Sequence, residues 1–171
     1  MWRPIATLVV GMVLALMAIG IVFIAGMRTK SPRVLGAVRQ VNRALWNPLS
    51  MKTAGKPGAY ASVIRHVGRT TGRPYETPIG AVATDDGFVI ALPYGSRADW
   101  VKNVLASGSA TIVDEGNMYR VDQPEIIPMA VVAPRFPPKD QRSFRMFCVD
   151  QCLRVRRVEA DEAPEQIADP A

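Results

Sequence analysis

The sequence has very few of the residues that most enzymes use as catalysts. It contains one histidine, His66, and two cysteines, Cys148 and Cys152, and it has no Gly-x-Ser-x-Gly motif. A single histidine excludes a metal site built from several histidines, and it argues against a Ser–His–Asp or Cys–His arrangement. We expect His66 to be a structural or pocket-wall residue and the two thiols to be buried and inert. Any redox chemistry would therefore come from a bound cofactor.

Features of nucleic-acid-binding proteins and of glycosidases are also lacking. The chain has no series of base-stacking aromatic residues, no helix-turn-helix pattern and no convincing carboxylate pair. Its net charge is +6, from 21 Lys and Arg against 15 Asp and Glu. Much of this excess lies between Arg28 and Lys56, where attraction to anionic lipid headgroups accounts for it. We therefore expect the lipid bilayer, and no nucleic acid, as a partner.

Charge is absent altogether from Pro4 to Gly26, where Val, Leu, Ile, Ala and Met dominate. A helix of about 23 residues is long enough to cross a hydrocarbon core of about 30 Å. A cleaved signal peptide would have a shorter apolar core and a small-residue cleavage site where Arg28-Thr29-Lys30 stands. A buried core helix would be shorter and amphipathic. The segment is thus predicted to be a single-pass membrane anchor.

The flanks of this segment predict its orientation. Only Arg3 precedes it, whereas Arg28, Lys30 and Arg33 follow closely. Because Lys and Arg concentrate on the cytoplasmic side of membrane spans, the rest of the chain is expected to face the cytoplasm. Trp2 is expected at the opposite interface. These features predict a single-pass protein of the cell membrane with its remaining domain in the cytoplasm.

Beyond the anchor, the sequence divides into further parts. Residues 1–30 form the anchor and its basic flank, 31–58 a juxtamembrane amphipathic helix and linker, 59–158 a β-rich domain, and 159–171 an acidic tail predicted to be disordered. The amphipathic helix is expected to end at Asn47-Pro48. Two placements stay open for it. Its basic face lies toward lipid headgroups, or its apolar stripe packs on the domain.

Short period-two segments predict the β-domain. Strands are expected near 60–67, 75–84, 88–92, 110–114, 118–122 and 153–158, and 125–129 extends the fifth. Short helices are expected at 99–106, ended by Ser107-Gly108, and at 139–147. Hairpin turns fall at 85–87 and 115–117. About six strands joined mostly by hairpins predict a mainly β (α+β) domain, a small antiparallel barrel.

Two segments, Gly68–Pro78 and Pro93–Asn103, are rich in groups that bind anions. The Gly-x-x-x-Gly turn allows exposed backbone N–H groups, and Arg69 and Arg73 offer guanidinium forks to a phosphate. The second segment runs into a helix whose start, near Asp99, favours an anion; Asp99 itself is predicted to cap that helix. Together the segments predict a phosphate-binding frame without a nucleophile.

In order and spacing, the two segments and the Gly-Phe-Val-Ile-Ala-Leu strand between them closely resemble the deazaflavin-dependent nitroreductase family of actinobacterial oxidoreductases. The likeness runs from about Gly55 to Val158. It implies a flavin-reductase-like split β-barrel that uses coenzyme F420, a deazaflavin. It also implies hydride transfer to a quinone, a nitro compound or another activated acceptor. The anchor favours a lipophilic acceptor such as menaquinone, and the fold favours a homodimer by analogy.

The resemblance also implies which residues hold the cofactor. The phosphate and acidic tail are assigned to Arg69, Thr70, Thr71, Gly72, Arg73, Tyr75, Thr77 and Pro78. The deazaflavin ring is assigned to Pro93, Tyr94, Gly95 and Ser96, with Asp99, Trp100 and Asn103 behind them. Tyr94 is the candidate catalytic residue, as a hydrogen-bond donor to a substrate oxygen; Tyr75 is a second candidate for that role. For either tyrosine, an aromatic pocket wall is the other interpretation.

Three positions depart from the family pattern. Thr70, Tyr75 and Tyr94 stand where better-known members carry basic residues. Each lost charge-assisted contact weakens binding of an acidic ligand by about 1.5–3 kcal/mol. Compensating charges are expected from Arg73, Arg97 and Lys102. Two alternatives therefore stay open: a split barrel that binds flavin mononucleotide (FMN) or haem, and a non-catalytic, membrane-tethered binding module.

Overall fold

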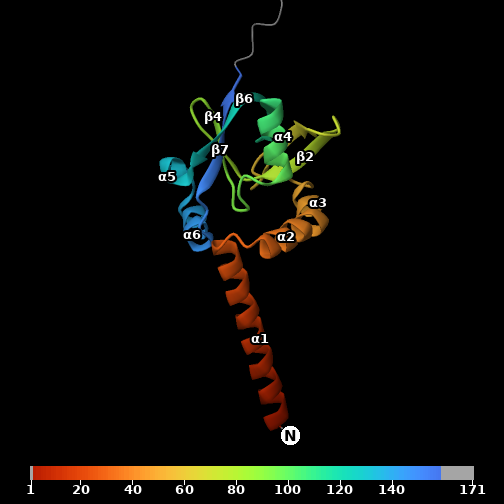
Figure 1. Cartoon of the computed structure of the whole chain (residues 1–171), viewed down its shortest axis with the longest axis vertical. Coiled ribbons are helices and arrows are strands. Elements are labelled where there is room, and N and C mark those ends of the chain that lie inside the picture. The colour runs from red at the N-terminus through yellow and green to blue at the C-terminus, as the bar shows by residue number, and fades with distance from the viewer. Residues whose placement is uncertain (1, 159–171) are drawn as a thin grey trace, which may run out of the picture.

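The computed structural model describes residues 2–158, so the predicted disordered tail lies outside the described residues. One long helix stands out from a β-rich domain (Figure 1). This helix, α1 (Trp2–Arg28), contains a segment of 24 residues, Ile5–Arg28, with a mean hydropathy of 2.9 and an unburied apolar surface. It is long and apolar enough to span a membrane, as the sequence predicts.

The last turns of α1 pack against the domain. Phe23 meets Phe147 edge to face, with 6.1 Å between ring centroids. Met27 is buried, and Gly26 lies so close to Val34 that a Cβ atom would overlap the valine side chain. Because these contacts involve two separate helices, they fix the direction in which α1 leaves the domain.

A second helical segment crosses the end of α1 (Figure 1). It consists of α2 (Pro32–Val41), a π-helical turn (Asn42–Trp46) and α3 (Asn47–Ser50), which follow one another without a break. The predicted end at Asn47-Pro48 is therefore wrong. A proline in a helix lacks an N–H group and its ring clashes with the carbonyl four residues earlier. The π-helical turn lies just before Pro48 and widens the helix there, so the chain continues to Ser50.

Seven strands form one antiparallel sheet, one more than expected. They are β1 (Ser62–Val67), β2 (Pro74–Ile79), β3 (Ala81–Ala83), β4 (Gly87–Ala91), β5 (Ser109–Asp114), β6 (Asn117–Pro128) and β7 (Gln151–Arg157). Their order is β2-β1-β5-β6-β7-β4-β3. The additional strand arises because Gly80 divides the predicted 75–84 strand: β2 pairs with β1, and β3 pairs with β4.

That division closes the sheet into a barrel-like shape. The strands β2 and β3 are the two edges of the sheet, yet only Gly80 separates them in the chain. The sheet must therefore curl until its edges meet beside this residue. The result is a curled, antiparallel half-barrel with short helices, which confirms the predicted fold class.

The barrel has a buried core on each side of the sheet. Inside the curl, α4 (Asp99–Ser107) packs Val101 and Val104 against Ile64, Phe88, Ile112 and Leu153. On the other face, α5 (Met129–Val132), a short 3-10 turn (Ala133–Arg135) and α6 (Pro138–Phe147) cover β4 and β7. Cys152 lies in this second core, where burial raises the pKa of its thiol to about 12, and Cys148 is half-buried and free. Both thiols are free.

Candidate functional site

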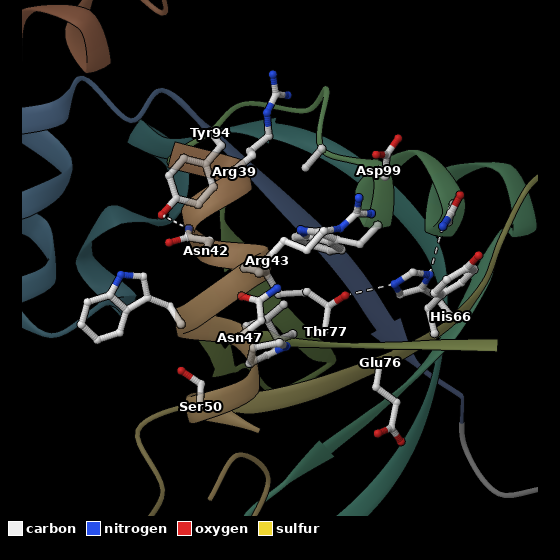
Figure 2. A pocket seen from close by; sticks show the side chains of 18 of the residues that line it. Arg39, Asn42, Arg43, Asn47, Ser50, His66, Glu76, Thr77, Tyr94 and Asp99 are labelled. Carbon is white, nitrogen blue, oxygen red and sulfur yellow. Dashed lines mark hydrogen bonds between the residues drawn. The ribbon is translucent and has the colours of Figure 1, made fainter. Parts of the chain in front are cut away.

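A cavity of about 1140 Å³ lies between the α2–α3 segment and the concave end of the sheet (Figure 2). Ligand pockets commonly measure about 300–1,000 Å³, so this cavity is large enough for a bulky cofactor. Both predicted segments reach it. The predicted site residues that line it are Arg69, Thr70, Thr71, Tyr75, Thr77, Pro78, Pro93, Tyr94, Gly95, Asp99, Trp100 and Asn103. Gly72, Arg73 and Ser96 are not among the lining residues.

In the turn between β1 and β2, some of the backbone N–H and carbonyl groups form hydrogen bonds with one another. The Gly68 N–H donates to the carbonyl of Arg73, and the Gly72 N–H donates to the carbonyl of Gly68, each at 2.8 Å. Gly72 has a φ of 64°, which a glycine adopts readily and which lets the turn close. No such bond is found for the N–H groups of Thr70 and Thr71 within the described chain. These two amides remain available to a ligand.

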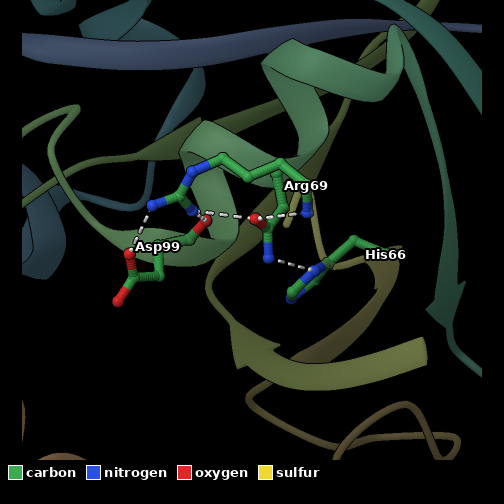
Figure 3. Close-up of polar contacts among 4 residues, drawn as sticks. His66, Arg69 and Asp99 are labelled. Atoms are coloured by element: carbon green, nitrogen blue, oxygen red, sulfur yellow. Dashed lines mark hydrogen bonds and ion pairs between the residues drawn. The ribbon is translucent and has the colours of Figure 1, made fainter. Parts of the chain in front are cut away.

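Arg69 connects this turn to α4 (Figure 3). Its guanidinium donates to Asn103 Oδ1 at 2.9 Å and forms an ion pair with Asp99 Oδ1 at 3.1 Å, and its backbone N–H also donates to Asn103 Oδ1. Helix α4 begins at Asp99 with Ala98 as its N-cap residue. The predicted capping role of Asp99 is therefore wrong, because its carboxylate pairs with Arg69. These bonds hold the two predicted segments together.

The same contacts define the protonation of His66. Because Asn103 Oδ1 accepts from Arg69, the Asn103 amide nitrogen must donate to His66 Nδ1, 3.2 Å away. His66 Nδ1 then carries no proton, and Nε2–H donates to Thr77 Oγ1 at 3.2 Å. Burial also lowers the pKa of His66, which keeps the ring neutral. His66 thus lies in the cavity wall with both ring nitrogens engaged.

Two tyrosines, Tyr75 and Tyr94, line the cavity. The Tyr75 ring stacks on His66, with 5.8 Å between centroids, and its hydroxyl lies 3.3 Å from Thr71 Oγ1. The hydroxyl of Tyr94 accepts a hydrogen bond of 2.7 Å from Asn42 Nδ2 on the α2–α3 segment. Figure 2 shows this contact at the side of the cavity formed by the helix. Since Asn42 occupies only an acceptor position, the Tyr94 O–H remains free to donate.

The juxtamembrane segment also brings positive charge to the cavity. Arg39 and Arg43 line it, and Figure 2 shows Arg43 extending between the helix and the sheet. The lining carboxylates are already paired, Glu76 with Arg65 at 2.8 Å and Asp99 with Arg69. Neither Arg39 nor Arg43 has an ion-pair partner among the residues that the structure describes. The uncompensated charge of the cavity is therefore positive.

No protein-family model and no curated protein matches the sequence. Among solved structures, the chain is similar to the heme storage protein HutZ from Vibrio cholerae, at 12% identity and a TM-score of 0.43 over 58% of this chain and 82% of that one. It is similar to an F420 reductase at 13% identity and a TM-score of 0.43, over 63% and 91%. An FMN-binding protein from Syntrophomonas wolfei subsp. wolfei gives 16% identity and a TM-score of 0.40, over 72% and 92%. Likenesses this remote carry no argument about ligand or activity.

The residues that the juxtamembrane segment contributes to the cavity are not predicted from the sequence. In one of the two open placements, Arg39 and Arg43 are expected to face lipid headgroups, and the sequence predicts no role for Asn42. A signal was present, because positions 39, 42, 43, 46 and 47 follow helical spacing and carry mostly polar residues. The sequence pattern does not predict which surface this polar face contacts. That surface depends on the positions of α1 and of the sheet.

Proposed function

We propose that this chain is a membrane-anchored oxidoreductase that binds the deazaflavin coenzyme in this cavity and passes a hydride from its reduced form to an activated acceptor. One observation carries the proposal. The two segments that resemble the deazaflavin-dependent family meet across a single cavity and are joined there by the Arg69–Asn103 and Arg69–Asp99 contacts.

The residues present fit an acidic cofactor. Arg39 and Arg43 supply unpaired positive charge, and the Thr70 and Thr71 amides supply donors for a phosphate. Arg69, assigned to phosphate by the resemblance, is held by Asp99 and Asn103, so we assign it a positioning role. The charges that Thr70, Tyr75 and Tyr94 fail to provide thus come from the juxtamembrane segment.

In the proposed reaction, the bound reduced coenzyme supplies the hydride, and the chain positions and polarises the acceptor. Tyr94 is held by Asn42 through its acceptor side, so its O–H can donate to an acceptor oxygen as negative charge develops there. The α2–α3 segment covers the cavity from one side and limits the access of water. His66 is neutral and fully engaged, and it takes no part in proton transfer.

The acceptor is proposed to be lipophilic, a quinone such as menaquinone or a nitro compound. The support is α1, whose unburied apolar surface would keep the cavity beside a bilayer. The domain is proposed to face the cytoplasm, because the basic residues follow the span.

Turnover by the full chain in vesicles tests this function. Oxidation of the reduced deazaflavin is followed by absorbance with a menaquinone analogue as acceptor. We expect Tyr94→Phe to lower kcat by about 10²-fold or more, the usual size for a lost oxyanion donor, without changing coenzyme affinity. Tyr75→Phe makes the same change at the second candidate donor in the same cavity and shows which tyrosine acts. No turnover by the unaltered chain with any quinone or nitro acceptor would contradict the proposal.

FMN is the second candidate, because two unpaired arginines suit a ligand with one phosphate as well as a more acidic one. Flavin absorbance of the purified chain would favour it. Haem receives less support: His66 has both nitrogens in hydrogen bonds, so it offers no free ligand to iron. No group of three or more metal-binding side chains occurs within residues 2–158.

A further inference from the structure

The α2–α3 segment has its two faces reversed relative to a typical surface helix. Its polar side chains Arg39, Asn42 and Arg43 line the cavity. The large apolar side chains that do not line the cavity are left exposed: Val41, Leu45 and Leu49 are 46%, 59% and 54% exposed. Amphipathic helices of soluble domains bury the apolar side. Both placements predicted for this helix are therefore incomplete, because Arg39 and Arg43 line the cavity and only the beginning of the apolar stripe is packed.

The position of this face relative to α1 is fixed. The segment starts four residues after α1 ends, and Leu35 is buried at the junction. Gly26 of α1 lies directly against Val34, so the two helices touch where they cross. In Figure 1, α2 runs across the end of α1 rather than along it. A segment so placed lies at the level where α1 would leave a bilayer.

The charge around this face suits an anionic surface. The first acidic residue of the chain is Glu76, so no carboxylate side chain precedes or lies within the segment. Arg33 and Lys52 are exposed near its two ends. An exposed apolar face with basic residues at its borders is the pattern of a helix that lies in the membrane interface.

We infer that the apolar face of α2–α3 (Val41, Leu45 and Leu49) rests in the interface of the bilayer. The segment is then a wall with the cavity on one side and lipid on the other. This inference rests on the proposed anchor but not on the identity of the cofactor. A second copy of the chain is the competing occupant. The bilayer is favoured because the segment directly follows α1, whose apolar surface is unburied, and because the face is bordered by the exposed cations Arg33 and Lys52.

A membrane-bound wall has a consequence for the cavity. Asn42, which holds Tyr94, lies one residue from Val41 and three from Leu45. Contact of the apolar face with lipid would therefore hold the polar face in place beside the ligand. An apolar acceptor dissolved in the bilayer would reach the cavity by passing one helix.

The test places a fluorescent label on this face of the full chain in vesicles. Cys148→Ser removes the partly exposed thiol, and Cys152 stays unlabelled because it is buried with its pKa raised to about 12. A single label is then attached at Leu45→Cys. The matched control is Lys102→Cys, an exposed position on α4, which lies at the far end of the domain from α1 (Figure 1).

Fluorescence quenching of the two labels by a lipid-bound quencher and by a water-soluble quencher is then compared. We expect nitroxide-bearing phospholipids to quench the label at position 45 several-fold more than the label at position 102, and aqueous iodide to show the reverse. Equal access of iodide to both labels would overturn the inference. A label at position 45 protected from iodide but not quenched by lipid would overturn it in favour of a second copy. Flotation of the vesicles reports the anchor separately, so loss of anchoring is distinguishable from a face that avoids lipid.

Discussion

At the scale of single residues, Asn103 is the side chain on which the site depends most. It is 6% exposed and contacts the backbone and guanidinium of Arg69 as well as His66. Asn103→Leu keeps the volume but leaves those groups without a partner. We expect the free energy of unfolding to fall by about 1–3 kcal/mol, the cost of buried unpaired polar groups. Chemical denaturation of the full chain in detergent measures it.

The control for this variant is Lys102→Met on the neighbouring, exposed position of α4. Surface changes of this kind usually alter stability by no more than about 0.5 kcal/mol. Equal stability of the two variants would show that the Arg69–Asn103–His66 contacts contribute little.

His66 makes the stability of the domain depend on pH. Burial lowers its pKa in the folded chain, below the unfolded value of about 6.5. The unfolded chain then binds more protons in acid, so this contribution is complete above about pH 6.5 and is lost as the pH falls toward the folded-state pKa. As the only histidine, it gives one set of imidazole NMR signals. We expect these to titrate below pH 6.5 in the folded chain; titration above that value would contradict the neutral ring.

At the scale of elements, the pairing of β4 with β7 depends on Gly87. A Cβ atom there would overlap the carbonyl oxygen of Val155 and crowd the backbone of Arg156, so the paired strand would have to shift. We expect Gly87→Ala to lower the unfolding free energy by about 1–3 kcal/mol through overpacking. Gly80→Ala is the matched control, because nothing lies within 4 Å of its Cβ position. Thermal unfolding of both variants measures the difference, and equal midpoints would count against this account of the pairing.

Most elements could be predicted from the sequence because their causes are local. Hairpin turns such as Asp85-Asp86-Gly87 and the glycine after α4 depend on neighbouring residues alone, and both occur as expected. Two errors have longer-range causes. Gly80 ends one strand pairing and begins another only because the sheet curls, and Pro48 is tolerated because a π-helical turn precedes it.

At the scale of the whole molecule, the orientation of the domain is open to direct test. With Cys148 replaced by Ser, a thiol at Lys102→Cys is exposed on the surface of the domain. We expect a membrane-impermeant maleimide to label it in inverted membrane vesicles and not in right-side-out ones, because the basic flank follows the span. Labelling in right-side-out vesicles alone would contradict a cytoplasmic domain. The homodimer stays a prediction.

The site was predictable only in part, for a reason that also belongs to the whole molecule. The two segments carry their spacing in the sequence, and the structure brings most of their residues to one cavity. The wall opposite them comes from residues 36–51, far away in the chain, and its place depends on how α1 ends against α2. From the sequence alone, Arg39 and Arg43 are therefore interpreted as membrane-facing charges, because the positions of the helices are not known from it.

The cavity is proposed to bind a deazaflavin with charge supplied by the α2–α3 segment. The most direct measurement is a fluorescence titration of the full chain with the oxidised deazaflavin coenzyme, beside FMN. We predict micromolar quenching by the deazaflavin, and a roughly tenfold or greater loss of affinity in both Arg39→Gln and Arg43→Gln, since each charge-assisted contact contributes about 1.5–3 kcal/mol. Arg97→Gln, outside the cavity lining, should bind normally. Binding of neither cofactor, or unchanged affinity in both arginine variants, would contradict the account.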